Sequence, residues 1–458
     1  MTAMPATPIP LQGWGAHARA LGALGVPLIG SNIANFAIHL TDIVLLGWYD
    51  VNALAAVTLA TSLYFVVFLM GSGFGWAVTP LVAAAAVAGD DVQVRRVTRM
   101  GLWLSVAFGI VTCIPMMWAE PFFLAIGQDP VVSALAQDYL TIAAWGMIPA
   151  LVITVLRAFL SALERTAIIL WATLGAVVIN ALVGYGLIFG AWGLPEMGIQ
   201  GAAWAAMATL ALSGVVMLAY VLRVFPTYRL WQRIWRIDPS VLARVFRLGA
   251  PIGLTSLAEG GLFSASAVMV GWIGAVELAA HGIALQLASA AFMFHLGLSQ
   301  ATTVRAGRAM GQRDGDNLRR TAHAALMMSL GFSLIGITLF LAMPQVLIGA
   351  FIDPEEPQRA QLLAIGVTML LVAALFQAVD GLQVVALGLL RGVQDTAVPM
   401  LLAAISYWVV GIPASYVLGF VVGWGAVGVW LGLVIGLLLA AVMLLARFWL
   451  RAVRFAGV

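Results

Sequence analysis

Three acidic side chains stand alone inside long apolar stretches of the sequence: Asp42, Glu259 and Asp380. An ionised carboxylate in hydrocarbon is costly, so such a residue is kept where it faces a cavity, a partner or an ion. No arginine falls close to them in the sequence, and we therefore expect no embedded positive partner. The chemistry predicted is reversible binding of something positive: a proton, a metal cation or a cationic organic molecule.

The composition places these acids in a membrane protein. Of the 458 residues, 63% are hydrophobic and only 9% are charged, and the mean hydropathy is +1.05. Soluble domains carry about a quarter charged residues. A single cysteine, Cys113, excludes an intramolecular disulfide. The basic residues are all arginine and follow membrane topology, so we expect no nucleic-acid partner.

Twelve apolar runs are long enough to cross a bilayer, and in lipid such runs must be helices because every backbone group needs a partner within the segment. With twelve spans, every arginine except Arg359 falls on one side of the membrane. The positive-inside rule makes that side cytoplasmic and places both termini there. The expected spans are 21–48, 51–83, 100–119, 138–162, 167–190, 198–222, 248–272, 277–303, 321–343, 361–390, 397–421 and 425–446.

The two halves of the chain resemble each other at a shift of 224 residues. Gly25-Val26-Pro27 matches Gly249-Ala250-Pro251, and Asp129-Pro130 matches Asp353-Pro354. A shift of six helices gives both halves the same orientation, as in transporters built from parallel repeats. We therefore predict an all-α polytopic fold of two six-helix lobes related by a pseudo-twofold axis along the membrane normal. The predicted divisions are a cytoplasmic segment 1–20, an N-lobe 21–222, a cytoplasmic linker 223–247, a C-lobe 248–446 and a cytoplasmic tail 447–458.

The repeat copies the scaffold but not the acids, so each lobe is expected to hold its own polar site at its own depth. The shift pairs Glu259 with Asn35, Asp42 with Ser266 and Asp380 with Ala150.

Aromatic and amide side chains accompany the acids of the second half. Phe263 lies one turn after Glu259 and shares its helix face. A carboxylate beside an aromatic ring suits an organic cation, through charge and cation–π attraction. A neutral acid hydrogen-bonded to a neighbouring helix, with the phenylalanines serving as packing, is the alternative. The neighbours of Asp380 on its own face are Phe376, Gln377 and Gln383.

In the first half, His39 precedes Asp42 by one turn and could modulate its proton affinity. Asn180 is a candidate neutral ligand beside Asp42, or alternatively a helix–helix hydrogen-bonding residue. The sequence shows no nucleophile–base set and no cluster of cysteine and histidine, so neither an enzyme nor a structural zinc site is expected.

Several short stretches around these residues are similar to the multidrug and toxic compound extrusion (MATE) family, in its NorM-type branch. The resemblance covers essentially the whole chain, and the placement of the three acids is its most specific part. The stretches that carry it are Thr41-Asp42-Ile43-Val44-Leu45-Leu46-Gly47, Ala53-Leu54-Ala55-Ala56-Val57, Gly249-Ala250-Pro251 with Glu259, Phe376-Gln377-Ala378-Val379-Asp380-Gly381-Leu382-Gln383 and Leu389-Leu390-Arg391-Gly392.

The resemblance implies two six-helix lobes enclosing a central cavity, in a protein of the bacterial inner membrane that exports cationic drugs or dyes. Export would be driven by H⁺ or Na⁺ entering, with no other cofactor, and we expect a monomer. Glu259 and Asp380 would couple the ion, and could hold Na⁺, while Asp42 and Asn180 would line an N-lobe site. Many relatives carry a second polar residue one turn past Asn180, where this chain has Gly184, which favours a proton role for Asp42.

Three other functions compete with an antiporter. A lipid-linked precursor flippase would need arginines inside its cavity, whereas the arginines here are expected at the cytoplasmic edge. A major-facilitator transporter would carry a different signature between its second and third helices than the Gly89–Arg96 stretch. A passive channel would not move a dye against its gradient.

Overall fold

The computed structural model describes residues 13–355 and 357–453, and every regular element in those ranges is a helix. Residues 1–12 and 454–458, which fall in the expected N-terminal segment and C-terminal tail, lie outside the described residues. Within the described ranges, twelve helices are long and apolar enough to cross a membrane. The predicted all-α fold with twelve spans is therefore confirmed.

Two compact units divide the chain. The N-unit runs from Gly30 to Gly253, and the C-unit joins the residues up to Ile29 with those from Leu254 onward. Both divisions fall inside a helix, in α1 (Trp14–Tyr49) and in α9 (Pro239–Ile273), and they are separated by the repeat shift of 224. Each of these two helices therefore gives its first part to one unit and its remainder to the other. The lobe boundaries inferred from the repeat remain a prediction.

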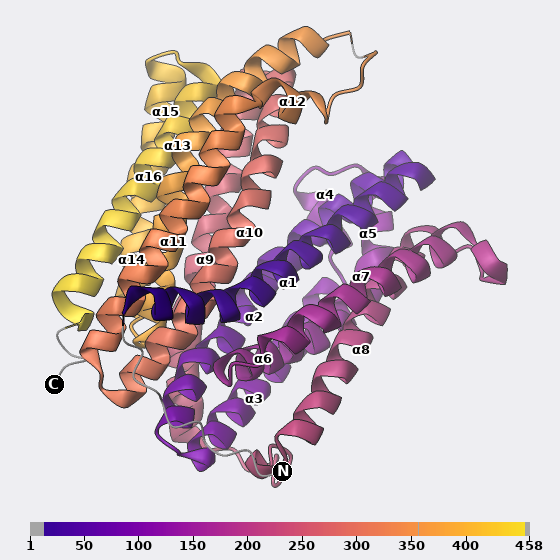
Figure 1. Cartoon of the computed structure of the whole chain (residues 1–458). Helices are drawn as coiled ribbons and strands as arrows, with labels where there is room; N and C mark the ends of the chain where they lie inside the picture. The colour runs from indigo at the N-terminus through magenta and orange to yellow at the C-terminus, as the bar shows by residue number, and fades with distance from the viewer. Residues whose placement is uncertain (1–12, 356, 454–458) are drawn as a thin grey trace. The chain divides into compact units, whose positions relative to one another are not determined.

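The other helices divide between the units (Figure 1). The N-unit contains α2 (Val51–Val87), α3 (Asp91–Met116), α4 (Glu120–Ala125), α5 (Pro130–Ala143), α6 (Met147–Ala162), α7 (Thr166–Phe189) and α8 (Gly198–Val224). The C-unit contains α10 (Ala275–Gln312), α11 (Gly315–Ala342), α12 (Pro344–Gly349), α13 (Arg359–Gly392), α14 (Ala397–Ala404), α15 (Ile412–Tyr416) and α16 (Gly425–Arg447), with wider π turns extending α14, α15 and α16.

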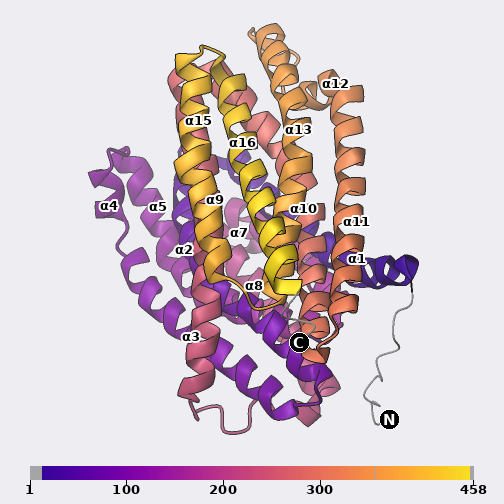
Figure 2. The same ribbon diagram turned by 90° about the vertical axis from the view of Figure 1, so that its left-hand side faces the viewer.

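α13 is the central helix of the C-unit. It packs against α10, α11 and α16, and Figure 2 shows it between α11 and α16. More than half of its residues are buried. From Phe376 to Leu390 no residue of this helix is exposed, so polar groups on this part must find partners inside the unit.

Aspartates cap equivalent helices in the two repeats. Asp90 accepts a hydrogen bond from the backbone N–H of Gln93 at 2.9 Å, and Asp314, which the shift of 224 pairs with Asp90, does the same for Asn317. Because this cap starts α3 at Asp91 rather than near residue 100, Arg95, Arg96 and Arg99 lie inside the helix instead of in the loop before it. The sequence prediction began this span at residue 100, after the charged residues. Capping by Asp90 allows the helix to begin earlier and to include them.

The segment between α8 and α9 is fastened to α3. Arg99 is buried, and its guanidinium donates to the backbone carbonyls of Leu230 at 2.6 Å, Arg229 at 3.0 Å and Gln232. The indole N–H of Trp103 donates to the carbonyl of Ile234 at 2.7 Å. One arginine thus donates to three carbonyls of this segment, of which only that of Arg229 also accepts from a backbone N–H, that of Gln232.

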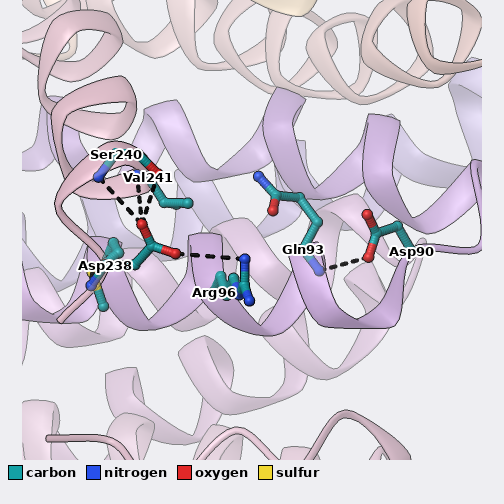
Figure 3. A network of polar contacts seen from close by, with 7 residues as sticks. Asp90, Gln93, Arg96, Asp238, Ser240 and Val241 are labelled. Carbon is teal, nitrogen blue, oxygen red and sulfur yellow. Dashed lines mark hydrogen bonds and ion pairs between the residues drawn. The ribbon is translucent and has the colours of Figure 1, made fainter. Parts of the chain in front are cut away.

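Asp238 caps the start of α9 at the end of this segment (Figure 3). The hydroxyl of Ser240 donates to its carboxylate at 2.7 Å, the backbone N–H of Val241 at 3.3 Å, and Arg96 lies 3.6 Å away. The Ser240 hydroxyl first, and then the backbone N–H groups and Arg96, hold the pKa of Asp238 below its usual value. The ion pair with Arg96 is largely exposed and contributes little to stability.

Substituting Gly297 by alanine should destabilise the C-unit. A Cβ at Gly297 of α10 would stand 2.7 Å from the backbone nitrogen of Ile29, so the first part of α1 would have to move away. We expect a loss of about 1–3 kcal/mol, typical of overpacking, seen as a lower Tm of the purified protein in detergent. Gly282→Ala on the same helix is the control: nothing lies within 4 Å of a Cβ there, so helix propensity alone predicts an unchanged or higher Tm. Equal Tm values for the two variants would contradict the close packing of α1 on α10.

Removing Arg99 should loosen the segment between α8 and α9. Arg99→Met leaves the carbonyls of Leu230 and Gln232 without their donor, while that of Arg229 keeps the backbone N–H of Gln232. We expect trypsin to cleave several-fold faster after the exposed Arg229, Arg233 and Arg236. Arg96→Met is the control, because its exposed ion pair holds little free energy. Cleavage at the wild-type rate in Arg99→Met would show that the segment is held by other contacts.

Candidate ion and substrate sites

The C-unit brings its two intramembrane acids together. Glu259 of α9 and Asp380 of α13 interact electrostatically, and Gln383, one turn after Asp380, approaches both Glu259 and Tyr407. The amide N–H of Gln383 donates to the Tyr407 hydroxyl at 2.5 Å. Residues far apart in the sequence thus form one polar cluster, as expected for Glu259, Asp380 and Gln383 and not foreseen for Tyr407.

The predicted face of α13 points into the protein. Its residues recur at intervals of three and four, so they form one stripe along the helix. The stripe consists of Phe376, Gln377, Asp380 and Gln383, all of which are at most 2% exposed. An acid on this stripe is not turned toward lipid, so the cost of its charge must be met from within the unit.

Several acceptor oxygens in this cluster have no hydrogen-bond partner among the described residues. A buried unsatisfied polar group costs about 1–3 kcal/mol. Four such oxygens in one cluster therefore favour occupation by protons, a cation or water, each of which supplies positive charge or N–H and O–H donors. The oxygens are Glu259 Oε1, Asp380 Oδ1, Gln377 Oε1 and Gln383 Oε1.

Aromatic rings lie next to the acids. Phe263 and Phe376 meet edge to face with their centroids 5.9 Å apart, so the two phenylalanines named from the sequence are in contact. Trp430 of α16 packs on Phe376 at 5.6 Å, and its indole N–H donates to His281 at 3.0 Å. Trp430 and His281 were not predicted, because nothing within their own apolar runs shows that four helices meet here.

A second set of polar residues adjoins Gln377 and was also missed. A ring nitrogen of His295 on α10 lies 3.4 Å from the Gln377 amide, and its other nitrogen lies 3.0 Å from the Ser333 hydroxyl of α11. Gly381 makes room for the imidazole, since a Cβ there would collide with the ring. These side chains extend the polar interior of the C-unit toward α11, and a lone histidine in an apolar run gives no sign of this.

The expectation that no acid has an embedded positive partner is wrong for Glu259. Arg391, near the end of α13, interacts electrostatically with Glu259 and Tyr407. The sequence separates these residues widely, but α9 and α13 belong to the same unit, so proximity along the chain was a poor guide. Arg391 is also not confined to a loop, because α13 continues to Gly392.

The N-unit holds a separate, smaller site. The amide N–H of Asn180 on α7 donates to a carboxylate oxygen of Asp42 on α1 at 3.0 Å, and Asn180 is fully buried. The oxygen of the same amide, Asn180 Oδ1, has no partner among the described residues. Tyr139 of α5 interacts electrostatically with Asp42. The structure thus places the predicted neutral ligand beside Asp42.

Two residues near this site, Gly184 and His39, provide no polar partner for Asp42. A Cβ at Gly184, one turn after Asn180, would lie 3.2 Å from Leu45, so the position is closely packed and offers no polar group. His39 is exposed, and the structure gives no hydrogen bond between it and Asp42. Among the described residues, no three His, Cys, Asp or Glu side chains come together as a metal site would require. Any Na⁺ would therefore rest on amide and hydroxyl oxygens as well as carboxylates.

Known proteins resemble this chain over nearly its full length. "Probable multidrug resistance protein NorM" from Rhizobium meliloti (strain 1021) is 46% identical over 439 residues, covering 95% of this chain and 94% of the relative. The protein of the same description from Agrobacterium fabrum is 46% identical over 437 residues, with the same coverage.

Solved structures share the fold at lower identity. One, described as "Crystal structure of MATE in the bent conformation", superposes with a TM-score of 0.87 at 18% identity, covering 96% of each chain. Another, described as the outward-facing conformation of a multidrug resistance MATE family transporter of the MOP superfamily, gives 0.86 at 20% identity, again covering 96% of each chain. The likeness at these identities concerns the fold.

A family model described as MatE matches residues 27–186 and again 251–417. The two matches begin 224 residues apart, which is the shift found in the sequence, so the repeat is a property of the family. This family is one of transporters and not of enzymes. The chain belongs to the MatE family, the multidrug and toxic compound extrusion family that its motifs resemble.

Proposed function

We propose that this protein is a secondary active multidrug exporter that expels organic cations in exchange for H⁺ or Na⁺. The observation that carries the proposal is the cluster of unpaired buried oxygens around Glu259 and Asp380. Its relatives bear the description of multidrug resistance proteins, which supports the same activity here.

The C-unit cluster can exchange one positive partner for another. Glu259 and Asp380 repel each other when both are ionised in a low-dielectric interior, so a bound proton or cation relieves the repulsion. Phe263 and Phe376 offer ring faces and edges beside the acids, where the apolar body and charge of an organic cation are both accommodated. Entry of the coupling ion from outside then releases the drug, and its loss to the cytoplasm restores the negative site.

Asp42 and Asn180 serve as a second coupling site in the proposed cycle. With Gly184 packed against Leu45, the site has one carboxylate and one amide. A sodium ion takes several oxygen ligands, whereas a proton needs only the carboxylate. We therefore propose that Asp42 binds a proton, and that the pair Glu259 and Asp380 binds either H⁺ or Na⁺.

The arginine distribution supports cytoplasmic termini, and the NorM relatives support a location in the bacterial inner membrane. We expect a monomer, because one chain contains both sites. The runner-up remains a lipid-linked precursor flippase of related architecture. The expected absence of inner arginines no longer counts against it, because Arg391 of α13 interacts electrostatically with Glu259. The acidic cluster with aromatic neighbours fits a cation better than a pyrophosphate. Membership of the MatE family argues against the major-facilitator alternative. Because the members of this family are transporters, it also argues against a passive channel.

Neutralising either acid of the C-unit cluster should abolish export. In vesicles, Asp380→Asn and Glu259→Gln should each lower uphill efflux of a cationic dye at least tenfold, because the exchangeable negative charge is lost while the side-chain volume is kept. Glu355→Gln, an exposed acid of the same unit, is the control and should export at the wild-type rate. Undiminished efflux in both amide variants would remove the basis of the proposed function.

Asp42 should be needed for efflux that is driven by a proton gradient. We expect Asp42→Asn to reduce dye efflux driven by a pH gradient about tenfold, because the amide cannot be protonated at this site. Efflux under a Na⁺ gradient, imposed separately at constant pH, reports the other ion. The exposed Asp138→Asn is the matched control in the same unit. If pH-driven efflux survives in Asp42→Asn while Na⁺-driven efflux is lost, the proton assignment is wrong.

A further inference from the structure

The segment between α8 and α9 has a large excess of positive charge. Residues 223–247 contain six arginines and one acid, Asp238, whose carboxylate already takes part in the cap of α9. Three of the arginines are exposed, and the structure gives their guanidinium groups no hydrogen bond or ion pair to any described residue: Arg229, Arg233 and Arg236. These three charges are free to attract a negative partner from outside the protein.

Exposed apolar side chains lie between these arginines. Trp231 is 38% exposed, Trp235 is 73% exposed and Ile237 is 48% exposed. Charged and aromatic side chains alternate at every second position, in the order Arg229, Trp231, Arg233 and Trp235. Indole rings favour the level of the lipid headgroups, because each ring is apolar but carries an N–H group, and arginines at the same level reach the lipid phosphates. The composition of the segment therefore fits a membrane surface.

The contacts of this segment with α3 place it at that surface. The indole N–H of Trp103 donates to the carbonyl of Ile234 at 2.7 Å. Trp103 stands near the beginning of the apolar run 100–119, where the sequence predicts that hydrocarbon gives way to headgroups. One turn earlier, Arg99 holds the carbonyl of Leu230 at 2.6 Å. These bonds engage the backbone of the segment and leave its exposed side chains available to lipid.

Two of the exposed arginines have a backbone conformation that favours glycine. The dihedral angle φ is 47° at Arg229 and 57° at Arg233. The Cβ atom of any other residue strains this left-handed conformation, whereas glycine adopts it freely. The chain thus has arginine at two positions where glycine would be less strained, which favours a role for the guanidinium groups.

We propose that residues 229–237 bind the phosphate groups of anionic phospholipids at the membrane surface. A guanidinium group donates to two phosphate oxygens at once, and several arginines close together attract a negatively charged leaflet. The indole rings of Trp231 and Trp235 then lie between the headgroups, which fixes the depth of the segment. The link between α8 and α9 is thereby held by lipid on its exposed side and by α3 through its backbone. Lipid binding here is independent of the exported molecule and of the coupling ion.

Anionic lipid should stabilise the purified protein through these arginines. Titrating dioleoylphosphatidylglycerol into the protein in detergent should raise its Tm more than dioleoylphosphatidylcholine does at the same concentration. One arginine near an anionic surface changes the affinity about fivefold, so Arg233→Gln should need about fivefold more phosphatidylglycerol to reach half of the increase. The combined variant Arg229→Gln/Arg233→Gln/Arg236→Gln should lose the increase over phosphatidylcholine.

A second combined variant controls for the loss of charge alone. It removes three exposed arginines at the end of α10 and the start of α11, and it should keep the wild-type response: Arg313→Gln/Arg319→Gln/Arg320→Gln. Inorganic phosphate at the same concentration as the lipid distinguishes a free anion from a headgroup, and it should leave the Tm unchanged.

Protection from trypsin shows where the lipid binds. In nanodiscs that contain phosphatidylglycerol, cleavage of the wild type after Arg229, Arg233 and Arg236 should be several-fold slower than in pure phosphatidylcholine, relative to cleavage after the exposed Arg165 of the same unit. High salt should remove this difference, because it screens the attraction between arginine and phosphate.

Any one of three results would overturn lipid binding by this segment. The first is a relative cleavage rate that phosphatidylglycerol leaves unchanged. The second is a control variant that loses the increase in Tm as fully as Arg229→Gln/Arg233→Gln/Arg236→Gln does, since the effect would then be one of overall charge. The third is inorganic phosphate raising the Tm as much as phosphatidylglycerol does.

Discussion

The cost of leaving a polar or charged group unsatisfied in an apolar interior governs this protein. In water, an unpaired carboxylate oxygen is solvated at no cost, but inside a membrane-spanning unit it must find a donor or a cation. The chain meets this demand with fixed partners in most places, such as the three carbonyls satisfied by Arg99. Around Glu259 and Asp380, four acceptor oxygens have no partner among the described residues, and the proposed function rests on this unmet demand.

The two repeats share their helix scaffold, whereas the acidic residues on which the proposed function rests differ between them. The helix-capping aspartates Asp90 and Asp314 are related by the repeat shift, as are the points where α1 and α9 pass from one unit to the other. These features concern backbone geometry, which both halves need equally. The acids follow no such relation, so the two units share a fold and differ in chemistry, with a carboxylate pair in one and Asp42 with Asn180 in the other.

The sequence was sufficient for the fold, because hydrophobic length and arginine placement depend on each segment alone. It also named Phe263 and Phe376 as neighbours of Glu259 and Asp380, and Asn180 as a neighbour of Asp42, since spacing of one turn and intramembrane polarity are local signals; the structure adds that the two phenylalanines are in contact. Tyr407, Trp430 and His295 could not be foreseen, because each joins its site by packing between helices distant in the chain. Arg391 shows the same limit: its place beside Glu259 depends on how α13 packs within the C-unit.

Arg391 also sets the charge balance of the proposed exchange. With both acids ionised, Glu259, Asp380 and Arg391 together carry one net negative charge, because the arginine offsets one of the two carboxylates. A proton, a sodium ion or a monovalent organic cation each brings the cluster to neutrality, and two of them at once would overshoot. Under the proposed function, competition for one unit of charge would make binding of the coupling ion and of the drug mutually exclusive. Without the arginine, two monovalent cations could be held together, and the exchange would lose its strict alternation.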